Sequence, residues 1–135
     1  MKSQVRGSSA SSYALSVLRI VTGLLFICHG LQKLFGMFGG HRVPVNAIPT
    51  SLFGIAGLIE VIGGTLLILG LFTRPVAFIL CGEMAFAYFK AHFPGGPFPI
   101  ENHGEIAVLN CFIFFYLIFA GGGPVSLDRI LRGKS

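Results

Sequence analysis

The sequence predicts an all-α polytopic membrane protein, an antiparallel bundle of four transmembrane helices with both termini in the cytoplasm. Of its 135 residues, 53% are hydrophobic and only 11% are charged, whereas about a quarter of the residues in a typical soluble domain are charged. A membrane-spanning helix needs about 20 mostly apolar residues. Four such helices and short loops use nearly the whole chain, which leaves no room for a second, soluble domain.

Four apolar stretches are the predicted spans: residues 13–38, 51–71, 75–93 and 104–120. Together they form a single membrane domain over residues 13–132. The short, basic, serine-rich segment 1–12 is predicted to be a disordered cytoplasmic tail, and residues 133–135 form a second tail. Lysine and arginine mark the cytoplasmic side of a membrane protein. They gather near both termini and at Arg74, which predicts the orientation.

The first span carries its charges on one face. Arg19, His29 and Lys33 fall within an arc of about 80° on an α-helix, and Gly23 and Gly30 border that arc. Each charge at membrane depth costs roughly 2.5 to 3.5 kcal/mol on insertion scales. We therefore expect this face to turn toward a protein interior that supplies partners.

The second and third spans contain the expected partners. Glu60 is the one ionisable residue of the second span, and Ser51 is expected to cap that helix. Small residues surround Glu60 on the helix, which allows close packing in a membrane. Glu83 and Lys90 lie about 20° apart on the third helix. Residues 72–75 form a tight turn, so the second and third spans are antiparallel neighbours.

Two loops are predicted on the outer side of the membrane. Residues 39–50 are rich in glycine and proline, and residues 94–103 hold three prolines, so both should be irregular. Asn102 and Glu105 have the spacing of a capping box, with Asn102 as the N-cap of the fourth span. A capping role for Glu105 therefore competes with a role in a polar site.

Opposite charges fall at matching depths when each residue adds about 1.5 Å along its helix. The expected contacts are Arg19 with Glu83, His29 with Glu60, and Glu105 with Lys33 or Lys90. No residue is identified as catalytic. The candidates for ligand binding or proton transfer are Arg19, His29, Lys33, Glu60, Glu83, Lys90 and Glu105.

Two interpretations of these charges are open. They could fix the register of the helices, or they could line a polar cavity that binds a ligand or moves protons. Ionisable residues inside a membrane are functional candidates by default, and small residues alone can join helices, so we favour the cavity. A carboxylate and a histidine near the midplane could exchange protons with a quinone or another lipophilic carrier.

Composition and spacing disfavour other classes of function. The formal net charge of +5 is spread over tails and loops rather than along a basic stripe, which argues against a nucleic-acid partner. Cys28, Cys81 and Cys111 form no C-x-x-C pair and are interpreted as small apolar packing residues. A redox-active thiol is the weaker alternative, because buried thiols without a cationic neighbour are usually inert. The histidines lack a compact ligand spacing, so a metal or haem site is the weaker alternative. No cofactor is assigned beyond the candidate quinone.

Several short motifs follow one another from residue 15 to residue 131. They are Leu18-Arg19, Gly23, Phe26, His29-Gly30, Lys33, Gly57-Leu58-Ile59-Glu60, Gly63-Gly64, Gly70-Leu71-Phe72-Thr73-Arg74, Glu83, Asn102 with Glu105, and Ser126-Leu127-Asp128. Their order and spacing resemble the DoxX family of small four-helix bacterial and archaeal membrane proteins. The resemblance implies a link to thiosulfate:quinone oxidoreductase, to membrane redox complexes and to oxidative or thiol stress. It assigns no catalytic group.

We therefore expect an inner (plasma) membrane protein that serves as a subunit or small oxidoreductase in quinone- or thiol-linked redox metabolism. One alternative is a transporter module for protons or a small solute that uses the same charges. Another is an anchor that holds soluble redox enzymes at the lipid bilayer through basic cytoplasmic tails. The glycine-rich helices also suit a homo-oligomer. Whether the chain is itself an enzyme stays open at this stage.

Overall fold

The computed structural model describes residues 9–133, so the predicted tails at residues 1–8 and 134–135 lie outside the described residues. Within residues 9–133 the chain is all-helical and contains no strand, which confirms the predicted all-α class. The four long helices are α1 (Ser9–Phe35), α2 (Leu52–Leu69), α3 (Thr73–Ala87) and α5 (Glu105–Ala120). The shorter elements are η1 (Met37–Gly39), η2 (Val45–Ala47), the π-helical turn η3 (Tyr88–His92), η4 (Phe93–Gly95), α4 (Pro99–Asn102) and α6 (Leu127–Arg132).

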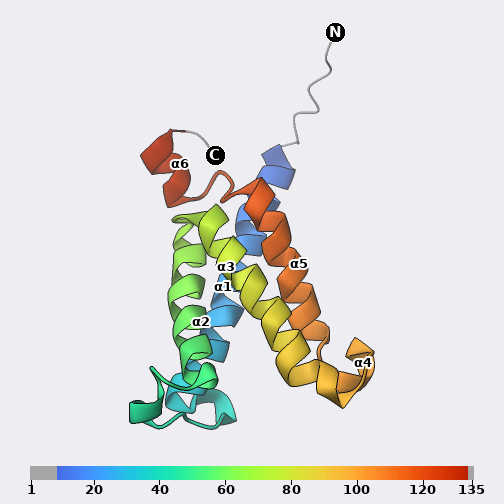
Figure 1. Ribbon diagram of the computed structural model, residues 1–135. Helices are drawn as coiled ribbons and strands as arrows, with labels where there is room; N and C mark the ends of the chain where they lie inside the picture. Colours follow the sequence, from blue (N-terminus) through green and yellow to red (C-terminus); the bar gives the residue numbers. More distant parts are fainter. Residues whose placement is uncertain (1–8, 134–135) are drawn as a thin grey trace.

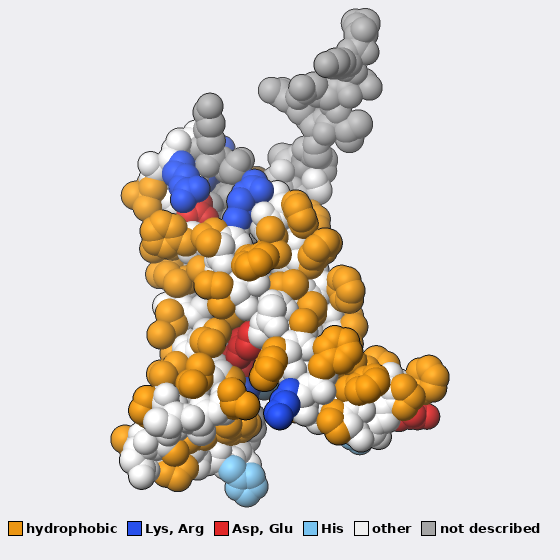
Figure 2. Space-filling model, viewed as in Figure 1, with side chains coloured by type: hydrophobic (Ala, Val, Ile, Leu, Met, Phe, Trp, Pro, Cys, Tyr) orange, Lys and Arg blue, Asp and Glu red, His pale blue; other side chains and the backbone are white. Residues whose placement is uncertain are grey.

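Three helical stretches are long and apolar enough to cross a membrane: Ser9–Phe35, Leu52–Leu69 and Thr73–Gly95. The third of these runs from α3 through η3 into η4. Helix α5 is also apolar but has 16 residues, a length of about 24 Å. Large hydrophobic side chains cover the outside of the long helices (Figure 2), as expected for a surface that contacts lipid. The chain is therefore a helical membrane protein.

The ends of α1 differ from the prediction. The helix begins at Ser9, so residues 9–12 are helical rather than part of a disordered tail. The first turns of α1 lie against the segment after α5, where a Cβ on Gly123 would lie 2.5 Å from the Ser16 hydroxyl. The helix ends at Phe35, before the predicted residue 38, because Gly36 has a φ of +67°. Glycine in this left-handed conformation commonly ends a helix.

The segment 94–103 contains a single helical turn, α4, although its prolines predicted an irregular loop. Pro99 occupies the first helical position, where the missing N–H is tolerated. The capping-box prediction is wrong, because Gly104 is the residue that precedes α5. Asn102 Oδ1 accepts a hydrogen bond from the Gly104 N–H at 2.9 Å, and the Asn102 amide donates to the Gly96 carbonyl at 2.8 Å. Its side chain therefore orders the loop.

The long helices form two antiparallel pairs, α1 with α2 and α3 with α5 (Figure 1). The pairs meet mainly through α2 and α3. These two helices are close at the tight turn that joins them, residues 70–72, and diverge toward the opposite end (Figure 1). We call these two ends of the molecule the turn end and the open end. The start of α1 and the C-terminal helix α6 both lie at the turn end.

Helices α1 and α2 pack backbone to backbone along a glycine seam, formed by Gly23 and Gly30 of α1 and Gly57 and Gly64 of α2. A Cβ on Gly23 would lie 2.8 Å from the Gly64 carbonyl oxygen, and a Cβ on Gly30 would lie 2.8 Å from the Gly57 carbonyl oxygen. The two glycines of each helix are seven residues apart, which places them on one face. The small-residue packing face expected around Glu60 is confirmed.

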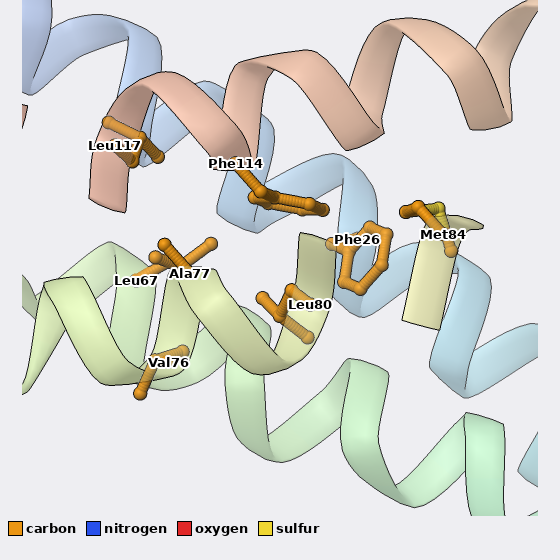
Figure 3. Packing of buried hydrophobic residues seen from close by; sticks show 8 residues of the cluster. All are labelled: Phe26, Leu67, Val76, Ala77, Leu80, Met84, Phe114 and Leu117. Carbon is orange, nitrogen blue, oxygen red and sulfur yellow. The ribbon is translucent and has the colours of Figure 1, made fainter. Parts of the chain in front are cut away.

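The hydrophobic core joins the two helix pairs (Figure 3). Its buried members come from all four long helices: Phe26, Leu67, Val76, Ala77, Leu80, Met84, Phe114 and Leu117. The rings of Phe26 and Phe114 meet edge to face, with centroids 4.9 Å apart, a geometry that favours aromatic pairs. Phe26 thereby connects α1 to α5 across the bundle.

Arg19 is fully buried, with 0% of its surface exposed. Its guanidinium donates hydrogen bonds to four carbonyl oxygens, those of Leu67, Ile68, Gly122 and Val125. The first two belong to the last turn of α2, where carbonyls have no i+4 donor. Arg19 therefore ties α1 to the end of α2 and to the segment after α5.

Asp128 holds the turn between α2 and α3. Its Oδ1 accepts a hydrogen bond from the Phe72 N–H at 2.7 Å, and its Oδ2 accepts one from the Thr73 N–H at 2.9 Å. The Asp128 N–H in turn donates to the Gly70 carbonyl at 2.9 Å. Two N–H groups at the start of α3, which lack intrahelical partners, are thus satisfied by a residue far along the chain. Ser126 caps α6, because its hydroxyl oxygen accepts a hydrogen bond from the Arg129 N–H at 3.3 Å.

The glycine seam predicts different outcomes for two glycine substitutions. Gly64→Ala would place a methyl group 2.8 Å from the Gly23 carbonyl oxygen, so α1 and α2 must separate. We expect the free energy of unfolding to fall by about 1 to 3 kcal/mol, as for an overpacked core. Gly82→Ala is the matched control, because a Cβ on Gly82 meets nothing within 4 Å. Thermal unfolding in detergent measures both variants, and equal losses would contradict the close packing.

The Asp128 contacts predict a pH dependence of stability. Burial alone would raise the pKa of the Asp128 carboxyl, but hydrogen bonds from Thr73 and Phe72 outweigh burial and hold the pKa below its ordinary value of 3.8. A lowered folded-state pKa stabilises the fold above the unfolded-state pKa, and this contribution is lost as the pH falls through the folded-state pKa. We therefore expect Asp128→Asn to melt at a lower temperature than the wild type at pH 7.

The difference in melting temperature should shrink as the pH falls below about 4, because the wild-type carboxyl then becomes protonated. Glu101→Gln serves as the control, since Glu101 is exposed and makes no ion pair within the described residues. A difference that stays constant down to the most acidic pH measured would show that the carboxylate charge does not hold the turn.

Candidate functional site

The Lys33–Glu60 ion pair lies at the centre of the polar site. Lys33 Nζ contacts Glu60 Oε1, the only ion pair among residues 9–133. The Glu60 side chain is 2% exposed and the Lys33 side chain is 20% exposed. The Lys33 ammonium also lies 5.3 Å from the centre of the Phe53 ring, a favourable cation–π distance. The antiparallel glycine seam brings the last turn of α1 alongside α2 and so allows this contact.

Glu83 contributes a second carboxyl group from α3. Both of its carboxyl oxygens are buried, as is Oε2 of Glu60, and none of the three has a hydrogen-bond partner among the described residues. Glu83 lies within electrostatic range of Glu60 and Lys33. Buried polar groups in proteins are normally hydrogen-bonded. Three carboxyl oxygens are therefore available to a ligand or to water.

The divergence of α2 and α3 opens a lateral cavity of about 630 Å³. This volume falls within the range of ligand pockets, roughly 300 to 1,000 Å³. Acidic and basic side chains appear between α2 and α3 in an otherwise hydrophobic face (Figure 2). The charged or titratable lining residues are Lys33, Glu60, Glu83, Lys90 and His92. The apolar walls include Leu52, Phe53, Ile55, Ile59, Ile79 and Phe86.

An apolar groove of about 330 Å³ extends this cavity along α2 and α3. Ile55, Ile59 and Ile79 line both spaces. Leu66 and Leu80 line the part of the groove nearer the turn end. A charged head and a long apolar channel are thus continuous on one side of the protein.

A second cavity of about 620 Å³ lies on the α1–α5 side of the ion pair. Lys33, Glu60 and His92 line this cavity as well as the first one. His29 and His103 are found on the second side alone. The ion pair is therefore reached from two sides of the open end.

Arg19 does not belong to this cluster. It lies about 21 Å along α1 from Lys33 at 1.5 Å per residue. The expected contact between Arg19 and Glu83 is wrong, because backbone carbonyls surround the guanidinium. Those carbonyls provide the hydrogen bonds that a buried arginine requires.

The expected contact between His29 and Glu60 is also wrong. His29 is exposed and lies within electrostatic range of Glu60, but the partner of Glu60 is Lys33. Lys33 lies one helical turn further along α1, and its long, flexible side chain can reach back to the carboxylate.

Glu105 stands apart from the cluster at the first position of α5. It is exposed and makes no ion pair within residues 9–133, so the expected contact with Lys33 or Lys90 is wrong. Lys33 is already paired with Glu60, and Lys90 is an exposed residue of the lateral cavity.

Sequence reasoning missed His92 and Phe53 as site residues. His92 lies in the π-helical turn η3, and its Nδ1 is 3.1 Å from the Asn102 carbonyl oxygen. A π turn holds one more residue than an α-helical turn. A helical projection at 100° per residue therefore misplaces side chains within and after the turn, including that of His92. Phe53 carries no signal beyond its position two residues after Ser51, because any apolar residue at the start of a span is expected to face lipid.

The arrangement can bind a polar group and move protons. Glu60 and Glu83 can donate or accept a proton, and Lys33 can stabilise negative charge next to them. The apolar walls lower the local dielectric constant, which strengthens hydrogen bonds inside the cavity. No group of three or more histidine, cysteine or acidic side chains that could hold a metal ion occurs within the described residues.

A double-mutant cycle tests whether Lys33 and Glu60 depend on each other. Removing one partner of a buried pair costs about 3 to 5 kcal/mol, whereas replacing both with apolar residues is nearly neutral. We therefore expect Lys33→Met to destabilise the protein strongly and Lys33→Met with Glu60→Met to recover most of the loss. Lys90→Met is the control, because Lys90 is exposed and makes no ion pair with any residue from 9 to 133. Additive losses in unfolding free energy would contradict the coupling.

The comparisons with known proteins cover the residues of this site. The DoxX family model matches residues 14–93, which include Lys33, Glu60, Glu83 and Lys90. An uncharacterized protein of Haemophilus influenzae is 46% identical over 87% of this chain and 90% of its own length.

Two further relatives have descriptive names. The Bacillus subtilis protein named "Putative oxidoreductase CatD" is 32% identical, with 87% of each chain covered. "Inner membrane protein YphA" of Escherichia coli is 29% identical over 90% of this chain and 92% of its own. No solved structure is significantly similar to the chain. By the family match and the relatives at this coverage, the chain belongs to the DoxX family.

Proposed function

We propose that this protein binds a membrane quinone through the Lys33, Glu60 and Glu83 cluster and exchanges protons with it as part of a redox system. The observation that carries this proposal is the continuous space between α2 and α3. Its charged end holds three carboxyl oxygens that have no hydrogen-bond partner among the described residues, and its other end is an apolar groove. A quinone has the matching form, a polar ring with two oxygens and a long hydrocarbon tail.

The proposed pose follows from the lining residues. The quinone ring lies beside Glu60 and Glu83 in the lateral cavity, and the tail lies along Ile55, Ile59 and Ile79. Reduction of a quinone to a quinol takes up two electrons and two protons. Two adjacent carboxyl groups provide proton donors at hydrogen-bond reach of the ring oxygens, and Lys33 stabilises the carboxylate left behind. The electrons come from a redox partner.

The same proposal includes the membrane arrangement. α1, α2, α3 with η3, and α5 cross the plasma membrane, and the turn end faces the cytoplasm. The basic residues of the turn end, such as Arg74, Arg129 and Arg132, support this orientation. The names of the relatives support the class of function, since one is called an oxidoreductase and another an inner membrane protein.

Transport of protons or a small solute is the alternative use of the same cluster. A transport path must continue to the other side of the membrane. On the turn-end side of the cluster the bundle interior holds the core residues Leu67, Leu80, Phe114 and Leu117, each 0% exposed. This packing favours binding in a closed-ended cavity over passage through the protein. An anchoring role would depend on the cytoplasmic ends instead of the cluster.

Quinone retention tests the proposal directly. We would purify the protein in native-lipid discs, extract the lipids and quantify quinone by mass spectrometry. We expect quinone to be enriched over the bulk membrane in the wild type. Glu60→Gln and Glu83→Gln should each lower the enrichment about tenfold, since a hydrogen bond to a charged group contributes about 1.5 to 3 kcal/mol. Glu105→Gln is the matched control and should retain quinone, because Glu105 is exposed and outside the cluster.

Several results would contradict the proposal. Quinone at the bulk level in the wild type would rule out the site, and an equal loss in Glu105→Gln would show that the effect is not local. Transport would be supported instead if liposomes that contain the wild-type protein show proton flux and liposomes that contain Glu60→Gln do not. Activity that survives Glu60→Gln but requires residues 126–135 would support the anchor.

A further inference from the structure

Cys81 of α3 and Cys111 of α5 face each other across the seam between these two helices. Their Sγ atoms are 3.7 Å apart, and the Cys111 thiol also donates to the Cys81 carbonyl at 3.6 Å. Both cysteines are free thiols. The sequence separates them by 30 residues, so their proximity arises from the packing of α3 on α5.

The pair lies near the middle of the membrane-spanning region. Cys81 is about 12 Å from the start of α3, and Cys111 is about 14 Å from the end of α5, at 1.5 Å per residue. Both side chains are half-buried. Neither cysteine lines the two cavities beside Glu60. Both side chains pack against the hydrophobic core, and we infer that their exposed parts face the lipid along the α3–α5 seam.

We propose that Cys81 and Cys111 form a redox-active dithiol that a membrane quinone oxidises to a disulfide. The two S–H bonds break and one S–S bond forms. The two electrons and two protons released by the thiols reduce one quinone to one quinol. The sulfur atoms of a disulfide are about 2.0 Å apart, whereas the Sγ atoms of Cys81 and Cys111 are 3.7 Å apart. The two sulfur atoms must therefore move closer by less than the length of one S–S bond. Rotation of the two side chains can supply this movement.

The position of the dithiol determines the class of oxidant. Water-soluble thiol reagents such as glutathione disulfide are polar and do not enter the hydrocarbon region, whereas quinones dissolve in it. The choice of quinone rests on the proposed function, but the dithiol itself does not, because it stands on the Cys81–Cys111 geometry. No cationic side chain contacts either thiol within the described residues, so the reaction should be slow. Slow oxidation by a quinone suits a sensor of the quinone pool.

The experiment uses the full chain, reduced and reconstituted in liposomes under argon, with decylubiquinone as the probe. Quinol formation is followed by ultraviolet absorbance, and free thiols by a maleimide gel shift. We expect roughly one quinol per chain, because two thiols supply two electrons, together with a linked Cys81–Cys111 peptide in the mass spectrum. Cys81→Ser and Cys111→Ser should each abolish quinol formation. Cys28→Ser is the matched control and should behave as the wild type, because Cys28 is exposed on another helix.

A second measurement is needed in case Cys81→Ser or Cys111→Ser fails to fold, and it blocks the thiols chemically in folded protein. Cys28→Ser protein treated with N-ethylmaleimide should form no quinol while keeping its elution volume. The proposal is overturned if decylubiquinone leaves both thiols alkylatable, even where diamide links them, since the geometry would then lack the proposed oxidant. Quinone enrichment at Glu60 is a separate readout. Enrichment without quinol formation would refute the dithiol alone, and dithiol oxidation without enrichment would support the dithiol and refute the polar quinone site.

Discussion

Pairing of buried charge is the constraint on which this structure depends. A glycine seam brings α1 and α2 so close that the Lys33 ammonium can reach the Glu60 carboxylate in the bundle interior. That pair uses one carboxyl oxygen and leaves three others, on Glu60 and Glu83, without a partner in the described part of the chain. A bundle built for stability alone would bury apolar side chains at these positions, because buried ion pairs are often no better than apolar replacements. The incomplete pairing therefore favours a binding role.

The turn end holds the helices together, whereas the open end contains the cavities. At the turn end, Arg19 and Asp128 bond to backbone groups and hold α1, the α2–α3 turn and the C-terminal segment together. At the open end, the helices diverge and the cavities form around Lys33 and Glu60. Rigid support at one end allows the other to remain open without loss of the fold. Of the charges on α1, Arg19 thus supports the structure and Lys33 belongs to the site.

The all-α class could be predicted from sequence, and so could several of the residues that meet at the candidate site. Composition predicted the apolar helices, and helical periodicity placed Lys33, Glu60 and Glu83 on faces that meet. The pairing of the charges could not be predicted. The depth of a residue in the membrane can be predicted from its sequence number only to within about one helical turn. An extended lysine side chain is longer than one turn, so it can reach partners at several depths. Neither the backbone carbonyls that bind Arg19 nor the π turn that contains His92 leaves a pattern in the residue types.

The sequence also does not show which helices pack against each other, so it does not predict that two distant cysteines meet. The lack of a C-x-x-C motif predicts packing roles for Cys81 and Cys111, yet the packing of α3 on α5 places their sulfur atoms 3.7 Å apart. The same limit applies to Asp128, whose role as a cap for α3 depends on a contact across the whole second half of the chain.

The hydrogen bonds of Arg19 determine which mutations this part of the protein can accept. Its four acceptors are main-chain oxygens, which every amino acid carries. The arginine therefore recognises the path of the chain and not the identity of its side chains. Residues such as Ile68 and Val125 can be exchanged by mutation while their carbonyls keep the same bond, whereas an insertion or deletion between Gly122 and Val125 would shift two acceptors at once. A change of residue type is therefore tolerated at Ile68 and Val125, whereas a change in the length of the segment is not.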